Sequence, residues 1–113
     1  MDPALLALCV HEVQVLPVIS TSGSGAREFG PARTVQARVQ ADQRRVVGRE
    51  GREVASSTLL FLAPTDTSGV ALTLGIDDKV VLPAGFIPQA PPIISIQPHY
   101  GATTALDHYE VRL

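Results

Sequence analysis

Residues 33–63 read RTVQARVQADQRRVVGREGREVASSTLLFLA, and this stretch decides the fold. Apolar side chains occupy alternate positions, at Val35, Ala37, Val39 and Ala41, with polar side chains between them. Successive side chains of a strand point to opposite faces of its sheet. The alternation therefore predicts a strand with one buried face.

The same stretch predicts that the chain then turns back on itself. Residues 48–51 read Gly-Arg-Glu-Gly, and glycine readily adopts the positive φ that a tight reversal needs. Residues 54–62 follow as a long stretch that ends in aliphatic and aromatic residues and is typical of a second strand. We therefore expect a β-hairpin whose register is set by its turn, and it carries no recognisable catalytic motif.

Further strands are expected on both sides of this hairpin. They are residues 10–19, 79–82, 92–98 and 107–113. Pro17 should interrupt the first, because proline cannot donate a hydrogen bond to a ladder. Residues 70–74 are short enough for either a brief strand or a turn of helix. In the last strand, Tyr109, Val111 and Leu113 alternate with polar residues and should face the interior.

The composition favours a single all-β domain over residues 1–113. The chain has nine prolines, nine glycines and only five aromatic residues, so its core must be aliphatic and its segments short. About six short strands in a chain of this length predict a small, closed or nearly closed β-barrel. The formal charge of −2 leaves no strongly basic face of the kind that nucleic-acid binding requires.

Residues 1–9 have two interpretations that the sequence leaves open. Asp2 and Pro3 suit the start of a short helical turn, and an extended N-terminal arm packed on a neighbouring subunit fits equally well. The segment carries no basic start, and its apolar run is much shorter than the roughly 20 residues of a membrane span. We therefore expect a protein that is made in the cytosol and has no membrane partner.

Residues 20–32 are rich in serine and glycine and are expected to form an extended flexible loop near the N-terminus. Connections of this length in compact domains are usually disordered or functional. It is therefore either a surface linker or a loop that becomes ordered against a partner or narrows a channel. The candidate residues are Ser22, Gly23, Ser24, Gly25, Ala26, Arg27, Glu28 and Phe29.

The hairpin concentrates most of the arginines of the chain. Arg44, Arg45, Arg49 and Arg52 should lie near its turn, with acidic residues interleaved. They form either a solvated, mixed-charge surface or a surface complementary to an acidic partner ring. No aromatic residue lies between them on which a nucleobase would stack.

Enzymatic and metal chemistry find little support. Ser24 lies in a flexible Gly-Ser-Gly segment and not in a nucleophile elbow, so we do not expect a hydrolytic triad. A barrel could bring two of the three histidines, His11, His99 and His108, together beside Asp107 or Glu12 to bind a metal, but they lack the spacing of metal ligands. Cys9 has no partner for a disulfide. From the sequence we expect the protein to bind neither a cofactor nor a metal, and we do not expect it to be an enzyme.

The order of these elements resembles the head-to-tail stopper, or head-closure, proteins of tailed bacteriophages with long non-contractile tails. The matching residues are Gly30 with Pro31, Thr34 with Val35, Arg44 with Arg45, residues 51–54, Ser56 with Ser57, and residues 78–83 and 108–113. The resemblance extends over most of the chain from about His11. Residues 86–91 depart from the family pattern, because they make a longer and more proline-rich connection than the usual tight turn.

The resemblance implies a structural virion protein of the phage neck. Such a protein forms a six- or twelvefold ring between the portal with its adaptor ring and the tail terminator or tail tube proteins. It closes the channel after packaging, retains the genomic DNA without binding it specifically, and offers a docking surface for the tail. The alternatives are a tail terminator or tail-completion ring and, in a different class, a small nucleic-acid-binding barrel of the OB or SH3-like kind.

Overall fold

The computed structural model describes residues 1, 3–47, 50–101 and 105–113 of an all-β chain. The elements are α1 (Pro3–Leu8), β1 (His11–Leu16), β2 (Val18–Thr21), β3 (Arg27–Phe29), β4 (Arg33–Val47), β5 (Glu53–Leu62), β6 (Lys79–Val81), β7 (Ser95–Tyr100) and β8 (Leu106–Arg112). The expected all-β barrel is confirmed. Of the two interpretations of residues 1–9, the structure has the short helix.

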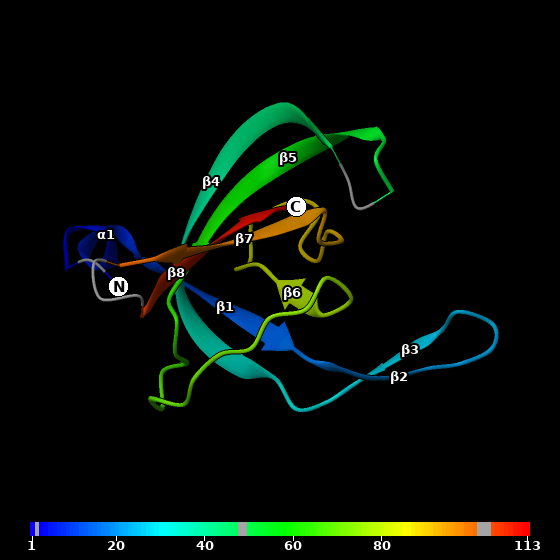
Figure 1. Cartoon of the computed structure of the whole chain (residues 1–113), viewed down its shortest axis with the longest axis horizontal. Coiled ribbons are helices and arrows are strands. Elements are labelled where there is room, and N and C mark those ends of the chain that lie inside the picture. Colours follow the sequence, from blue (N-terminus) through cyan, green and yellow to red (C-terminus); the bar gives the residue numbers. More distant parts are fainter. Residues whose placement is uncertain (2, 48–49, 102–104) are drawn as a thin grey trace.

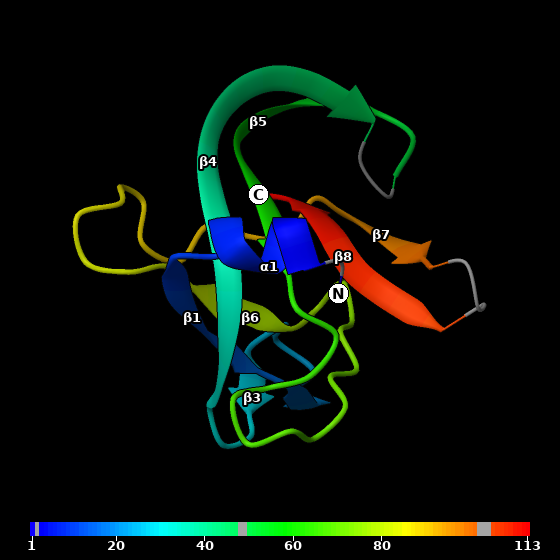
Figure 2. The same cartoon turned by 90° about the vertical axis from the view of Figure 1, so that its left-hand side faces the viewer.

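Six strands form one curled antiparallel sheet in the order β6-β1-β4-β5-β8-β7, and β2 pairs with β3 in a separate sheet (Figure 1). Figure 2 shows β4 and β5 bending over the rest of the sheet, which gives the shape of a half-barrel. Its edges are β6 and β7. Leu82 and Ile93, on the connection between these edge strands, are buried in the core.

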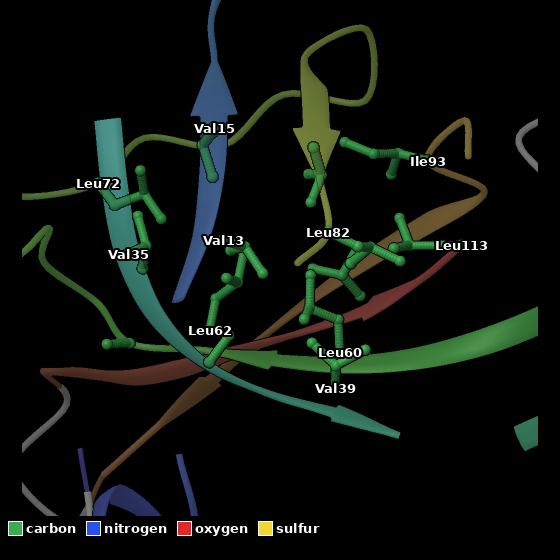
Figure 3. Close-up of a cluster of buried hydrophobic side chains, with 14 residues drawn as sticks. Val13, Val15, Val35, Val39, Leu60, Leu62, Leu72, Leu82, Ile93 and Leu113 are labelled. Carbon is green, nitrogen blue, oxygen red and sulfur yellow. The ribbon is translucent and has the colours of Figure 1, made fainter. Parts of the chain in front are cut away.

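The core lies on the concave side of this sheet and is almost entirely aliphatic. Figure 3 shows Val13, Val35, Leu60, Leu62 and Leu113 pointing toward one another from β1, β4, β5 and the end of the chain. The expected orientation of the last strand is confirmed, since Val111 is fully buried and Tyr109 packs against the same cluster. Each buried aliphatic side chain contributes about 1.5–3 kcal/mol of hydrophobic stabilisation.

The long hairpin of β4 and β5 has the predicted strands, with a β-bulge inside them. Val35, Ala37 and Val39 are buried as the alternation predicts, but Ala41 is exposed. The register shifts between Ala41 and Arg44, so alternation cannot continue to the end of the strand. Gly51 has a φ of 79° at the turn. Gly48 and Arg49, also expected in this turn, lie outside the described residues.

Three other sequence predictions need correction. Residues 20–32 are not one extended loop, because Val18–Thr21 pairs with Arg27–Phe29. Residues 70–74 form neither a strand nor a helical turn, and Ala71 makes only an isolated bridge with Thr65. The strand expected at residues 92–98 runs from Ser95 to Tyr100, because the consecutive prolines Pro91 and Pro92 delay its start.

Candidate assembly surfaces

Two hairpins project from the half-barrel on the side away from α1 (Figure 1). One is formed by β2 and β3 with the turn between them, and we call it the arm. The other is the end of the β4–β5 hairpin, residues 42–47 and 50–56, and we call it the tip. The arm contains every residue of the expected channel loop, and the tip contains the described hairpin arginines.

The arm is an ordered hairpin that presents polar side chains to solvent. Its turn is closed by a 2.7 Å hydrogen bond from the Ser22 amide to the Ala26 carbonyl and a 2.9 Å bond from the Gly25 amide to the Ser22 carbonyl. Gly25 has a φ of 85°, which a residue with a side chain rarely adopts. Ser20 Oγ donates across the strands to Glu28 Oε2 at 3.1 Å. All described residues from Ser20 to Glu28 are exposed.

The base of the arm is attached to the residues around β6. Arg27 lies 3.2 Å from an oxygen of Asp77, and the Val18 amide donates to Asp78 Oδ1 at 3.0 Å. Lys79 Nζ lies 5.8 Å from the centroid of the Phe29 ring. Phe29, the last candidate residue of the expected loop, is half-buried, so it anchors the arm and does not lie at its free end.

The tip is held in its curved path by an ion pair that crosses the sheet. Arg112 Nη1 donates to Asp42 Oδ2 at 2.9 Å, and the Arg112 side chain is only 10 % exposed. Asp42 lies within the bulge of β4, so the extra residues of the bulge direct this carboxylate toward β8. Arg44 lies 3.8 Å from the same carboxylate oxygen and is 62 % exposed. The sequence contained no signal for Arg112 as a buried partner.

The remaining arginines of the tip point into solvent. Arg45 and Arg52 are exposed, and no carboxylate of the described residues forms an ion pair with either. Arg44 and Arg45 lie opposite Ser56 and Ala55, on opposite faces of the ribbon. Arg44, Arg45, Ser56 and Ser57 line a shallow groove together with Gln43 and Ala55. Arg49 lies outside the described residues, so its position in this group stays a prediction.

The structure brings two of the three histidines together, as the sequence allowed for a barrel. His99 and His108 are paired across β7 and β8 with their rings stacked 4.7 Å apart. His108 Nδ1 lies 2.6 Å from Asp107, and His99 Nε2 lies 2.9 Å from Glu110. Even so, in the part of the chain that the structure describes, no three histidine, cysteine or acidic side chains are arranged to hold a metal ion.

Residues considered for nucleophilic chemistry are separated. Ser24 lies at the exposed end of the arm, where its hydroxyl is 2.8 Å from that of Ser22. His11 Nδ1 accepts a 3.3 Å hydrogen bond from the Val39 amide, and this bond ties β1 to β4. Cys9 is buried, and its burial raises the pKa of its thiol, which disfavours the thiolate. Among the residues that the structure describes, no histidine or carboxylate is hydrogen-bonded to Ser24 or to Cys9.

Comparison of the chain with models of protein families, with curated proteins and with solved structures gives no match. Within the described ranges, the structure has no helix that is both long and apolar enough to cross a membrane. Function must therefore be inferred from the side chains themselves and from the two projecting hairpins.

Proposed function

We propose that this protein is a ring-forming head-to-tail stopper of a phage neck, where it closes the DNA channel after packaging. The observation that carries the proposal is the projection of two hairpins, the arm and the tip, from one side of a small half-barrel. A stopper subunit needs a rigid body, a surface for the partner proteins that it joins and an element that reaches beyond the body. The half-barrel, the tip and the arm match these three requirements.

The mechanism that we propose is steric. In a ring with cyclic symmetry, each subunit repeats one heterologous contact, so modest contacts add up around the circle. A portal and adaptor ring above the stopper would hold neighbouring copies at high effective concentration and favour closure. The arms would then narrow the channel, and the opposite side of the ring would receive the tail.

The chemistry of the two hairpins supports these different roles. The end of the arm, residues 20–28, is exposed and largely polar and contains one acidic and one basic residue, Glu28 and Arg27, so it offers DNA no basic surface to bind. The tip combines arginines with the exposed apolar side chains of Val47 and Val54. Protein interfaces commonly combine an apolar centre with a charged rim, so the tip suits a protein partner.

The experiment that tests this function is electron microscopy of lysates from a phage that lacks the gene. A stopper predicts DNA-emptied heads beside complete, unattached tails. Stable, full heads beside tails of uncontrolled length would instead identify a tail terminator. Normal virions would show that the protein is not a component on which the neck depends.

A second measurement separates the neck function from the nucleic-acid-binding alternative. The purified protein should not be retained on duplex DNA at moderate salt, because its net charge is −2. Clear retention that weakens steeply as salt increases would favour the small nucleic-acid-binding barrel.

A further inference from the structure

Residues 40–47 of β4, most of which belong to the tip, form a strand edge that has no partner strand on one side among the described residues. β4 pairs with β1 only through Arg33–Ala37, whereas its pairing with β5 continues to Val47. The Val39 amide still donates a hydrogen bond to His11. Beyond it, residues 40–47 face no described strand along the edge that β1 occupies earlier in β4. Figure 1 shows this part of β4 as the outer strand of the ribbon. An unpaired edge is a template to which another extended chain can add.

The charge of this edge limits the kind of chain that fits. Arg44 and Arg45 are consecutive on the strand, so an added strand meets one guanidinium on each of its faces. Asp42 is already bonded to Arg112, and Arg45 makes no ion pair with a described residue. Guanidinium groups bind carboxylates through paired, charge-assisted hydrogen bonds. A second copy would place arginines against arginines if it added through the same edge.

We propose that the edge of β4 at residues 40–47 binds an extended acidic segment of a partner protein by strand addition. Main-chain hydrogen bonds along the edge supply affinity, and carboxylates opposite Arg44 and Arg45 supply orientation and specificity. The location of that partner in the neck rests on the proposed function, whereas the binding itself does not. Binding by the isolated protein therefore stands or fails separately from the phage experiment.

The test uses a short, fluorescently labelled synthetic peptide in which Glu and Thr alternate, and fluorescence anisotropy reports its binding. We expect saturable binding that weakens about tenfold when Arg44→Gln and Arg45→Gln are combined, because two solvent-exposed guanidinium–carboxylate contacts are lost together. Arg27→Gln, at an exposed arginine of the arm, is the matched control and should bind as the wild type does. Both substituted sites are exposed, so folding should not change.

Strand addition is separated from simple charge attraction by two N-methylated forms of the peptide. One form carries methyl groups on the amides of its odd-numbered residues, and the other carries them on the amides of its even-numbered residues. An edge strand bonds to only one side of the added chain, so one form should lose binding and the other should keep it. Equal binding by both forms, tighter binding of a duplex DNA oligonucleotide to the same arginines, or closure of the edge by self-association in the absence of peptide would overturn the proposal.

Discussion

Asp66 organises the loop that follows β5. Its Oδ1 accepts hydrogen bonds from the Ser68 hydroxyl at 2.7 Å and from the amides of Ser68 and Val70 at 3.0 Å each. Arg33 Nε donates to Oδ2 at 2.9 Å, and Arg33 Nη2 also donates to the carbonyls of Val70 and Ala71. One carboxylate and one guanidinium thus attach this loop to the beginning of β4.

These contacts make the stability of the protein depend on pH. The hydrogen bonds from the Ser68 hydroxyl and the Val70 amide, together with Arg33, hold the pKa of Asp66 well below its ordinary value. As the pH falls from about 5 through about 3.9, the ordinary pKa of an aspartate, Asp66 takes up a proton in the unfolded chain but stays ionised in the folded protein. The stabilisation is complete above that range and is lost progressively as the pH decreases toward the folded pKa.

Asp66→Asn should remove this pH-dependent contribution. Urea unfolding of the wild type and the variant should differ most near neutral pH, and the difference should shrink in acid. The measurement is the urea midpoint of both proteins at several pH values from about 7 to about 3, across the range in which an aspartate titrates. An unchanging difference over that range would show that Asp66 does not titrate as the contacts predict. Asp77→Asn, at a more exposed carboxylate, is the matched control.

Arg112 has the least exposed charged side chain of the tip's ion pairs, and removing its partner should be costly. Asp42→Ala leaves a nearly buried guanidinium without its 2.9 Å acceptor, so we expect a loss of about 2 kcal/mol in the free energy of unfolding. Arg27→Ala breaks an exposed pair with Asp77 and should cost less than about 1 kcal/mol. Chemical denaturation measures the free energy of unfolding of both variants. Equal losses would show that the Asp42–Arg112 pair stabilises the fold no more than an exposed ion pair does.

At the scale of the element, β5 combines two environments. Leu60 and Leu62 are completely buried in the core, whereas Glu53, Val54 and Ala55 belong to the exposed tip. Leu60→Ala should therefore cost about 2–5 kcal/mol, from lost burial and the cavity that remains. Val47→Ala on the facing strand, where the side chain is 63 % exposed, should change stability by less than about 0.5 kcal/mol. A large effect of the tip substitution would mean that the tip packs against the body.

The elements also show which features local sequence can predict. Alternation identified the buried face of β4 through Val39, and Pro17 correctly marked the end of β1, because both follow from the chemistry of a single strand. The bulge after Ala41 depends on pairing with β5 and on the Asp42–Arg112 contact, 70 residues apart, so no local pattern contains it. The arm was missed because its Ser-Gly composition resembles a linker, although the turn at Gly25 allows pairing.

At the scale of the whole molecule, the half-barrel body holds the hydrophobic core, and the two projecting hairpins provide the exposed surfaces. The aliphatic core lies within the curled sheet, and described residues of the arm and the tip that bear charge lie outside it (Figures 1 and 3). Changes at exposed residues of either hairpin that make no contact with the body should thus leave the body folded, so their effects on assembly can be measured without a general loss of structure.

The last prediction uses this separation to test the proposed roles of the two hairpins in the same phage. Deletion of residues 22–28 removes the end of the arm and should give stoppers that join the neck but fail to retain the genome. Arg44→Glu combined with Arg45→Glu should instead prevent the stopper from joining, because charge reversal opposes an acidic partner. Particle-bound stopper and packaged DNA report the two steps separately, with Glu12→Gln, at an exposed residue of β1 outside both hairpins, as a control for a neutral surface change. Normal genome retention in particles that carry the arm deletion would exclude the arm as the element that closes the channel, and loss of the stopper from those particles would assign the arm to assembly instead.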